Sequence, residues 1–412
     1  MPSKTPPRMR LIFVNRYFWP DHSATAQMLE DLAIELCRAG FDVTVIASRQ
    51  CLDMANARLP RYEDHNGIQV LRLSTTRFGR NWLPGRALDY LTFYIASTMT
   101  LLRHIRKGDV VIAMTDPPLL GTALSATVRL LRGRLVIWWQ DVYPEAAVRL
   151  GVLNNRALAS TLRILRNRSL RAAQLNVVIG EHMRRFLLRE APDARIELIG
   201  NWSRDHHWTT EPPADSALRV QLGLQRKLIV GYSGNLGRAH NLTSLLAASV
   251  RLQHFSQLHF LLIGGGVGYA QLKEQCLKLG LRNWSFAPYQ SSEALADALG
   301  AIDLHVVSLR PELEGLIVPS KIYGVLSVAR GSVVLAAPDG ELSQFNDSAQ
   351  IMRIVTPDDV ESLCRVLTEL ISDRGILLQM GRRSRQTFER HHTLDTAVRS
   401  WSELLHQLVN DK

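Results

Sequence analysis

Short apolar runs alternate with amphipathic stretches along most of the chain. The first run, Met9–Asn15, is nearly continuous in apolar residues, which is typical of a strand buried on both faces of a parallel sheet. A helix with apolar positions at i, i+3 and i+4 is predicted over Ala26–Arg38, and Gly40 ends it. A second strand, Asp42–Ala47, completes a βαβ unit, for which a right-handed crossover is expected.

The same alternation continues in two series. Segment 204–226 separates them, because it has a Pro212-Pro213 pair and no apolar period. The first series predicts strands at Ile68–Leu73, Val110–Ala113, Leu135–Trp138, Leu175–Ile179 and Ile196–Ile199. The second predicts strands at Leu228–Tyr232, His259–Ile263, Trp284–Phe286, Leu304–Ser308, Val333–Ala336 and Ile351–Val355, and then helices at Val360–Ile371 and Leu394–Val409.

This order of elements predicts an α/β protein with two doubly wound domains. We expect a first domain over residues 1–203, a linker over 204–226, a second domain over 227–390 and a C-terminal helix over 391–412. Doubly wound sheets bind their ligands at the carboxyl ends of the strands, so the loops that follow the strands are the first places to search for chemistry.

Composition is that of an ordinary soluble globular protein, with 46% hydrophobic and 21% charged residues in 412. The longest nearly apolar run, Tyr90–Leu102, has 13 residues, whereas a membrane span needs roughly 20. Residues 1–10 lack the apolar core and cleavage site of a signal peptide, so we expect a cytoplasmic location.

The four cysteines are scattered without a C-x-x-C pair, which argues against a zinc site or a disulfide framework. The adjacent histidines His206-His207 and His391-His392 do not have the i, i+4 spacing of helical metal ligands, and the sequence has no Asp-x-Asp triplet. We therefore expect no metal.

The net charge of +11 lies entirely in the first half. Residues 1–200 contain 28 Lys and Arg against 17 Asp and Glu, and residues 201–412 contain 21 of each kind. Nucleic acid, an anionic membrane surface and chance each explain such an asymmetry. The arginines are dispersed and no nucleic-acid motif accompanies them, so a membrane surface is favoured over nucleic acid.

One basic amphipathic helix is predicted at Asn155–Ala173. Its apolar face contains Leu158, Leu162, Leu165 and Ala172, and its opposite face contains Arg156, Arg163, Arg166 and Arg171. Such a helix is suited to anionic lipid, with about 1 kcal/mol for each basic residue near the surface, and Tyr90–Leu102 could contribute. The alternative is that both helices only cover the first sheet.

The stretch Glu314–Tyr323 combines a carboxylate, a backbone turn and a cation after a predicted strand. Pro319 is suited to the first position of a helix that Gly331 ends. The N–H groups at such a start favour an anion, and Ser320 and Lys321 add a hydroxyl and a positive charge. The combination suits a ligand with a diphosphate and a polar ring, although an ordinary loop with a solvated lysine has the same spacing.

Two other loops follow strands in corresponding places of the two halves. The loop that contains Ser23 and Ala24 allows a ligand close to the backbone, unless Ser23 only caps the next helix. Glycines at every third residue from Gly231 to Gly237 permit tight turns, and Arg238 offers a forked donor for phosphate. The dinucleotide fingerprint G-x-G-x-x-G is absent here and near Gly264-Gly265-Gly266, which disfavours a nicotinamide dehydrogenase.

Two acidic side chains follow the predicted strand Leu135–Trp138. Asp141 and Glu145 are placed to orient an acceptor hydroxyl or to take its proton. Alternatively, Asp141 caps the next turn and Glu145 is solvated.

Taken together, these motifs resemble the bacterial glycosyltransferases of family 4. The likeness extends from M-R-L-I-F-V-N-R-Y-F-W-P through D-P-P-L-L-G at Asp116, Q-D-V-Y-P-E at Gln140 and G-N-L-G-R-A to E-G-L-I-V-P-S-K, nearly the full length. It is strongest for the subgroup that builds capsule, O-antigen and exopolysaccharide units. It implies the GT-B architecture, in which two Rossmann-like domains face each other across a cleft and the last helix crosses back to the first domain.

The resemblance also implies an activity. A sugar is transferred from a nucleotide diphosphate sugar, such as a UDP- or GDP-sugar, with retention of configuration and without a metal or other cofactor. The second domain binds the nucleotide. The first domain binds the acceptor, a polyprenyl-diphosphate-linked saccharide at the inner face of the plasma membrane, with which the protein would associate peripherally.

The site residues follow from the same likeness. Glu314 matches the first glutamate of the family's E-x7-E signature, and Gly315 to Val318 match its backbone contacts. The expected catalytic residues are Asp141, Glu145, Arg238, Glu314 and Lys321. The expected donor-binding residues are Ser23, Ala24, Gly234, Asn235, Arg238, Gly264, Gly265, Tyr289, Glu314, Gly315, Leu316, Ile317, Val318, Ser320 and Lys321.

The chain also departs from the family pattern. Ile322 replaces the second glutamate, so ribose recognition must differ. Asn235 and His240 replace a phosphate-binding arginine and lysine, and we expect Arg238 and Lys321 to supply that charge. Two alternatives follow: a nucleotide-sugar epimerase of the same architecture, and a non-catalytic scaffold in polysaccharide assembly.

Overall fold

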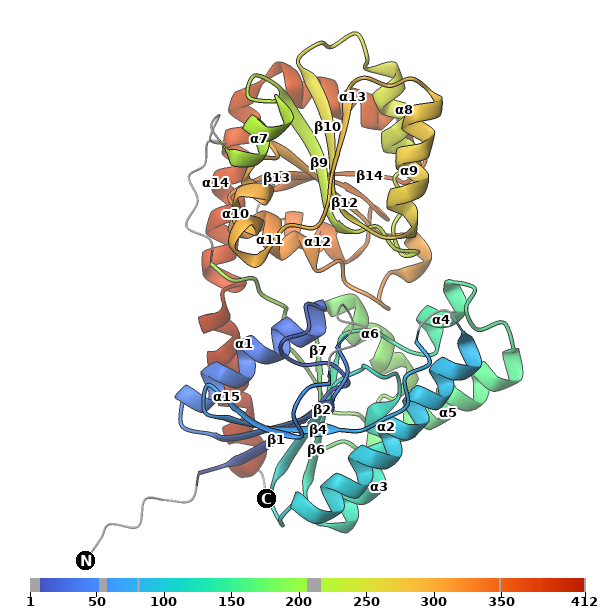
Figure 1. Cartoon of the computed structure of the whole chain (residues 1–412), viewed down its shortest axis with the longest axis vertical. Helices are drawn as coiled ribbons and strands as arrows, with labels where there is room; N and C mark the ends of the chain where they lie inside the picture. The colour runs from blue at the N-terminus through green and yellow to red at the C-terminus, as the bar shows by residue number, and fades with distance from the viewer. Residues whose placement is uncertain (1–7, 52–57, 80–81, 206–215, 348–349, 411–412) are drawn as a thin grey trace, which may run out of the picture. The chain divides into compact units, whose positions relative to one another are not determined.

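The computed structural model describes residues 8–51, 58–79, 82–205, 216–347 and 350–410, which form two compact α/β units (Figure 1). The first unit contains residues 1–200 together with 397–412, and the second contains residues 201–396.

The first unit is built on an eight-stranded sheet in the order β3-β4-β2-β1-β5-β6-β7-β8. β3 is an antiparallel edge strand, and the other pairs are parallel. The strand order reverses between β1 and β5, which are parallel and whose side chains are almost all buried. The strands are β1 (Arg10–Val14), β2 (Asp42–Ser48), β3 (Tyr62–His65), β4 (Ile68–Leu73), β5 (Val110–Ala113), β6 (Arg134–Trp139), β7 (Leu175–Val178) and β8 (Ile196–Leu198).

Helices cover this sheet, and the last helix of the chain is one of them. Trp401 is fully buried and packs edge-on against Trp138 of β6, with ring centroids 5.1 Å apart. The expectation that the C-terminal helix returns to the first domain is therefore confirmed. The helices are α1 (Ala24–Arg38), α2 (Leu83–His104), α3 (Leu120–Leu130), α4 (Glu145–Arg149), α5 (Arg156–Ala172), α6 (Glu181–Glu190) and α15 (Leu394–Asn410).

The second unit has a six-stranded, fully parallel sheet in the order β11-β10-β9-β12-β13-β14. Numbered within the unit this is 3-2-1-4-5-6, the Rossmann order. β9 and β12 pair only at Leu304–Val230 and His305–Gly231, so they diverge toward their carboxyl ends. The strands are β9 (Leu228–Asn235), β10 (Leu258–Gly265), β11 (Trp284–Ala287), β12 (Leu304–Ser308), β13 (Gly331–Leu335) and β14 (Met352–Val355).

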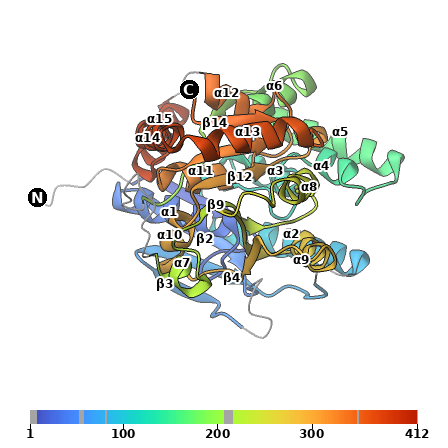
Figure 2. The ribbon, with the colours of Figure 1, turned by 90° about the horizontal axis from the view of Figure 1, so that it is seen from above.

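Alternating residues of these strands belong to two separate apolar clusters, one on each face of the sheet. Val230 and Phe260 pack with α8, α9 and α13, whereas Ile229 and Leu261 pack with α7 and α10. Figure 2 shows α7 and α10 next to each other and away from α13. The helices are α7 (Ala217–Leu222), α8 (Thr243–Arg251), α9 (Val267–Lys278), α10 (Ser292–Gly300), α11 (Lys321–Ser327), α12 (Glu341–Asp347), α13 (Val360–Ser372) and α14 (Arg374–His391), with a 3-10 turn η1 (Pro311–Leu313).

The predicted linker 204–226 is partly folded into the second unit. Residues 206–215 lie outside the described residues, but α7 follows them, and its Leu218 packs in the apolar cluster of Ile229. Arg219 of α7 forms an ion pair with Asp303 at 2.6 Å. The short apolar period of α7 was too brief to be distinguished from a loop by sequence pattern.

The predicted helix at Pro319 is shorter than expected at both ends. Ser320 is the N-cap residue, α11 begins at Lys321, and Gly331 is the first residue of β13 instead of the helix stop. The backbone at Ala329 is left-handed, with φ of 54°, which ends the helical turn before Gly331.

Candidate functional sites

In the second unit, predicted site residues gather at the carboxyl ends of the central strands. Gly234 and Asn235 end β9, and they pair with Gly264 and Gly265 at the end of β10. The segment after β12 contains Glu314 and leads into α11. This is the point where the strand order reverses, which is where doubly wound sheets bind ligands.

Glycine is required at this edge because the backbones and one side chain approach closely. A Cβ on Gly264 would lie 2.3 Å from the carbonyl oxygen of Gly234. A Cβ on Gly234 would lie 2.8 Å from Cε of Lys321. Both glycines also have positive φ, 128° and 116°, which side-chain-bearing residues rarely adopt. Gly264 therefore allows the two strand ends to approach each other, and Gly234 leaves room for the side chain of Lys321.

The ammonium group of Lys321 ends among neutral acceptors. Nζ lies 3.3 Å from the carbonyl oxygen of Asn235 and 3.1 Å from Nε2 of His240, and 5.0 Å from the centre of the Tyr232 ring. Burial lowers the pKa of Lys321 to about 8. In the described part of the chain no carboxylate forms an ion pair with it, so its charge is left for a ligand.

His240 is oriented to accept a hydrogen bond from that ammonium. Its Nδ1 lies 2.5 Å from the carbonyl oxygen of Ser308, which can only accept, so Nδ1 bears the hydrogen and Nε2 presents a lone pair to Lys321. Burial and the nearby Lys321 lower the pKa of His240 to about 4, which keeps it neutral at physiological pH. The sequence marked His240 only as a replaced lysine and gave it no role.

Glu314 has one satisfied and one unsatisfied carboxylate oxygen. Oε2 accepts the backbone N–H of Glu341, the first residue of α12, at 3.0 Å. Oε1 is buried without a hydrogen-bond partner among the described residues, and a Cβ on Gly340 would lie 2.3 Å from it. Burial raises the pKa of Glu314. An acceptor in this state suits a ligand hydroxyl.

Ile322 does not line this site. Its side chain is fully buried in the core beside Tyr323, which is also buried. A carboxylate in the same orientation at position 322 would be buried away from solvent, which is energetically costly. Core packing therefore explains the isoleucine.

The remaining donor-binding predictions differ in accessibility. Leu316 and Val318 are buried, so they can offer only backbone to a ligand, and Gly315 has φ of 73°. Ser320 is exposed. The Tyr289 ring is 59% exposed and lies against the backbone of Gly265, where a Cβ would be 2.8 Å from Cε2 of the ring.

Arg238 is exposed in the turn after β9, and its guanidinium makes no hydrogen bond or ion pair with the other described residues. Its carbonyl oxygen accepts from Nη1 of Arg310 at 3.5 Å. Sequence reasoning did not include Arg310, which follows β12 and forms an ion pair with Glu312. Its place directly after a predicted strand was the available signal.

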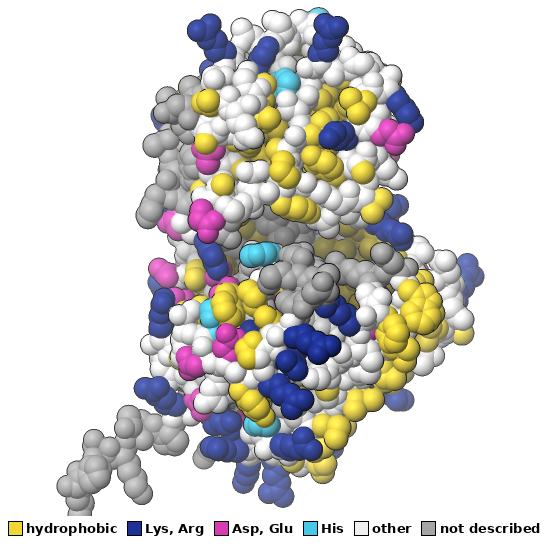
Figure 3. Space-filling model, in the orientation of Figure 1, with side chains coloured by type: hydrophobic (Ala, Val, Ile, Leu, Met, Phe, Trp, Pro, Cys, Tyr) yellow, Lys and Arg dark blue, Asp and Glu magenta, His cyan; other side chains and the backbone are white. Residues whose placement is uncertain are grey.

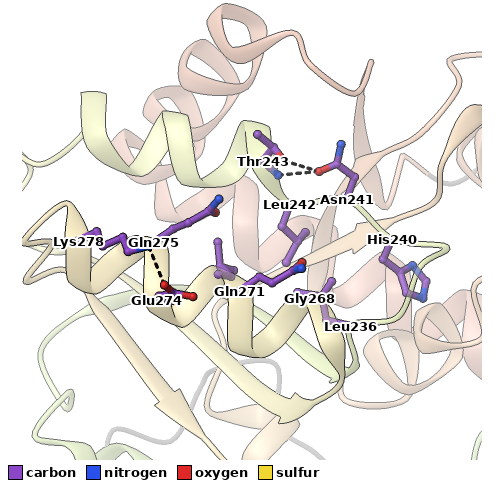
Figure 4. Close-up of a pocket in the computed structure, with 11 residues that line it drawn as sticks. Leu236, His240, Asn241, Leu242, Thr243, Gly268, Gln271, Glu274, Gln275 and Lys278 are labelled. Atoms are coloured by element: carbon purple, nitrogen blue, oxygen red, sulfur yellow. Dashed lines mark hydrogen bonds and ion pairs between the residues drawn. The ribbon is translucent and has the colours of Figure 1, made fainter. Parts of the chain in front are cut away.

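Next to this site, a surface pocket of about 400 Å³ lies between the loop after β9 and α9 (Figure 4). His240 stands at one end of the pocket, and Lys278, ion-paired with Glu274 at 2.6 Å, stands at the other. Neither Glu314 nor Lys321 is among the described residues that line it. The pocket therefore adjoins the lysine site through the imidazole of His240 and is separate from it.

In the first unit, the strand ends present carboxylates instead. Asp116 follows β5 and Asp141 follows the neighbouring β6. Burial, and secondarily the charge of Asp116, raises the pKa of Asp141 to about 6. The backbone N–H of Asp141 is 3.4 Å from Oγ1 of Thr115. Sequence reasoning predicted a role for Asp141 but not for Asp116.

Aromatic side chains and an arginine surround these carboxylates. Arg86 of α2 donates from Nε to the Tyr90 hydroxyl at 2.7 Å. Burial raises the pKa of Tyr143, and the charge of Asp141 adds to the effect. The Tyr94 hydroxyl, also from α2, donates to the carbonyl oxygen of Pro118. The result is a cluster of two acids and several phenols at the strand ends.

The loop after β1 adds an unsatisfied hydroxyl. Ser23 is the N-cap residue of α1, but its side chain makes no capping bond, and Oγ is buried without a partner among the described residues. Its backbone N–H donates to Oδ1 of Asp21 at 2.8 Å. Ala24 is exposed as the first residue of α1.

Glu145 has a structural partner. Its Oε1 accepts from Nη2 of Arg166 at 2.7 Å, and the same nitrogen lies 3.3 Å from Glu190. Arg166 is fully buried, so its placement on a solvent-facing side of the basic helix was wrong. Helical periodicity could not indicate that two acids from neighbouring helices would neutralise it. The ion pair gives Glu145 a role in packing α4 and α5.

Within the described ranges, no group of three or more His, Cys, Asp or Glu side chains is arranged to bind a metal ion. Of the helices in those ranges, none has the combined length and apolar character that crossing a bilayer requires.

Comparison with known proteins identifies the family of the chain. Residues 23–202 match the glycosyl transferase 4-like domain, and residues 215–387 match the glycosyl transferases group 1. The chain is 28% identical over 335 residues to the putative colanic acid biosynthesis glycosyl transferase WcaI of Escherichia coli (strain K12), covering 79% of each chain. It is also 28% identical over 305 residues to the probable glycosyltransferase WbjE of Pseudomonas aeruginosa, covering 71% of this chain and 74% of WbjE.

Among solved structures, HepE from Anabaena in complex with UDP-glucose is similar in fold. The TM-score is 0.72 at 17% sequence identity, over 97% of this chain and 100% of HepE. The chain therefore belongs to the family 4 glycosyltransferases of GT-B fold and is related to enzymes of bacterial polysaccharide biosynthesis.

Proposed function

We propose that this glycosyltransferase moves a sugar from a nucleotide diphosphate sugar to a lipid-linked saccharide, with retention of anomeric configuration. The observation that supports it most directly is the Lys321 ammonium at the strand ends, which has only neutral acceptors around it. A buried cation without a carboxylate partner is a site for an anion, and a leaving diphosphate is the anion that this reaction releases.

The donor would be bound in the second unit. Gly234 and Gly264 let the diphosphate approach the backbone, Lys321 neutralises it, and the free Oε1 of Glu314 accepts from a sugar hydroxyl. Arg238 lies in the turn after β9 and Arg310 contacts its backbone, so both could add positive charge beside the diphosphate. The exposed Tyr289 ring offers a surface for the base. UDP in the HepE complex supports a UDP-sugar.

The acceptor would be bound in the first unit. Asp141, with its pKa of about 6, is mostly ionised at neutral pH and would accept from the attacking hydroxyl, while Asp116 and Tyr143 lie close enough to influence its charge or be influenced by it. The relation to a colanic acid biosynthesis enzyme supports a saccharide acceptor. A polyprenyl-diphosphate carrier would place the protein on the cytoplasmic membrane surface, which the basic residues of 1–200 favour.

The experiment is a thermal-shift screen of UDP-, GDP- and dTDP-sugars, followed by transfer from each stabilising donor to membrane lipid extract. We expect one nucleotide class to raise Tm and support transfer. Glu314→Gln should abolish most transfer and leave the affinity for UDP alone within about twofold, because the carboxylate contacts the sugar. Glu274→Gln on α9 is the control, and normal transfer is expected.

Two results would contradict the proposal: near-normal turnover of Glu314→Gln, or nucleotide release that does not depend on an acceptor. The second result would restore the epimerase. The epimerase and scaffold alternatives are now disfavoured, because the relatives are glycosyltransferases.

A further inference from the structure

Helix α2 exposes a more apolar face than the one it buries. Its buried positions are Gly85, Asp89, Phe93, Ser97 and Leu101, of which three are small or polar. Its exposed side has large apolar residues, each 43–53% exposed, that we call the α2 stripe: Leu88, Leu91, Ile95, Met99 and Leu102. A surface helix normally has the reverse distribution.

The α2 stripe is one continuous surface. Its residues follow each other at intervals of three or four, which places them along one side of the helix. Trp82 and Phe78 extend it at the start of α2, with ring centroids 5.5 Å apart, and both are about half exposed. Figure 3 shows hydrophobic side chains in a diagonal band that follows the course of α2 in Figure 1. Contiguous exposed apolar surface of this kind marks an interaction site.

Charge around the stripe indicates the kind of partner. The segment from Arg77 to Lys107 contains six basic residues and a single acid, Asp89. Asp89 is buried and forms an ion pair with Arg16 at 3.2 Å. Arg103, Arg106 and Lys107 are exposed at the end of the stripe. A partner that offers both an apolar interior and negative charge is an anionic lipid surface.

The opposite side of α2 supports the same partner. Arg86, Tyr90 and Tyr94 lie on that side, and Arg86 and Tyr94 interact electrostatically with Asp116 at the strand ends. If α2 lay on a lipid surface, a lipid-linked acceptor would reach the cluster of Asp116 and Asp141 along this helix. A second copy of the chain is a poorer partner, because pairing two such faces would bring like charges together.

Helix α5, in contrast, has no comparable surface. Its Arg166 is buried, and its exposed large apolar residues, Leu158 and Ile164, are six positions apart and so do not share one side. One of the basic residues of α5, Arg166, forms ion pairs within the unit instead of facing solvent.

We propose that the α2 stripe docks on an anionic bilayer surface, with Arg103, Arg106 and Lys107 near the headgroups and Trp82 at the interface. The preference for a lipid surface over another partner rests in part on the proposed lipid-linked acceptor. Docking itself requires neither a sugar donor nor turnover. Vesicle binding can therefore be measured separately from the reaction.

The test is co-sedimentation of the full chain with phosphatidylcholine vesicles, with and without phosphatidylglycerol. We expect clear binding only with phosphatidylglycerol, and at least tenfold weaker binding for the double variant Leu91→Ser with Ile95→Ser. The control is Val267→Ser with Leu277→Ser on α9, which removes two apolar residues of the second unit that are even more exposed (66% and 72%, against 50% and 53% for Leu91 and Ile95) and should bind like the parent. Unchanged Tm in both variants shows that they are folded.

Wild-type-like vesicle binding by the α2 double variant would overturn the proposal. A concentration-dependent dimer that the same substitutions dissociate, without vesicle binding by the parent, would assign the stripe to a second copy and also overturn it. If vesicle binding follows the prediction but no nucleotide sugar is turned over, the docking surface stands and the proposed function fails.

Discussion

The two sheets share a design and differ in what they present at their strand ends. Each reverses its strand order at a central pair, β1 and β5 in the first unit and β9 and β12 in the second. The second presents glycines and the ammonium of Lys321, whereas the first presents Asp116 and Asp141 among tyrosines. The sheet fixes where a ligand binds, and the loops decide its charge.

The partners of the charged groups differ as well. Lys321 is surrounded by a carbonyl oxygen and a neutral imidazole, which orient the ammonium without neutralising it. Asp141 is buried and has another carboxylate nearby, and both features raise its pKa, burial more than the neighbouring charge. A lone cation suits a diphosphate, and a carboxylate with a raised pKa suits exchange of a proton with a hydroxyl. The comparison predicts that substitutions in the two sites affect different substrates.

The largest expected effect is a loss of stability in the first unit, and it distinguishes a structural ion pair from a group of the candidate site. Arg166→Ala leaves Glu145 and Glu190 without their buried partner, so the free energy of unfolding should fall by about 3–5 kcal/mol. Urea denaturation measures it. Arg163→Ala, at an exposed position on the same helix, should change stability by no more than about 0.5 kcal/mol. Equal effects of the two substitutions would show that the ion pair is not structural.

The second largest effect is expected from removing the ammonium group of Lys321 in the second unit. Under the proposed function, Lys321→Ala should lower kcat/KM by about 100- to 1,000-fold, because the charge proposed to stabilise the leaving diphosphate is lost. UDP binding should weaken, while the KM for the acceptor stays close to the parent value. Lys278→Ala, which removes a lysine at the far end of the neighbouring pocket, is the control. A Lys321→Ala enzyme that keeps its donor affinity would remove this residue from the site.

The complementary substitution in the first unit is Asp141→Asn. Turnover should fall by about 10- to 100-fold, since a charged acceptor of the attacking hydroxyl is lost, and UDP affinity should stay unchanged. Steady-state kinetics with varied acceptor, together with calorimetric UDP titration, measure the two quantities. If UDP affinity falls as much as turnover does, the division between the two sites is wrong.

The smallest effect is a pH dependence of donor binding. The pKa of Lys321 in the free protein is about 8, so the ammonium is mostly charged at pH 7 and mostly neutral at pH 9. Affinity for UDP should therefore fall as pH rises, by about tenfold between pH 7 and pH 9. Isothermal titration at several pH values tests it. The fall should be absent in Lys321→Ala, and its persistence there would assign the titration to another group.

Sequence alone determined the architecture and most of the candidate residues. Short apolar-rich runs predicted Ile68–Leu73, Val110–Ala113 and Leu304–Ser308 with the bounds that the structure has. Val110–Ala113 is apolar at every position because the strand is buried on both faces, whereas Ile68–Leu73 also contains the polar Gln69 and Arg72. Glu314 and Lys321 were found because they follow such a strand.

Tertiary structure decided which charges remain available and which faces are exposed. His240 and Lys321 are 81 positions apart, so no local pattern could pair them. Periodicity indicates that a helix has two faces, but the sheet beneath it decides which one is buried. For that reason Arg166 is in the core, Ile322 is in the core, and the apolar face of α2 is at the surface.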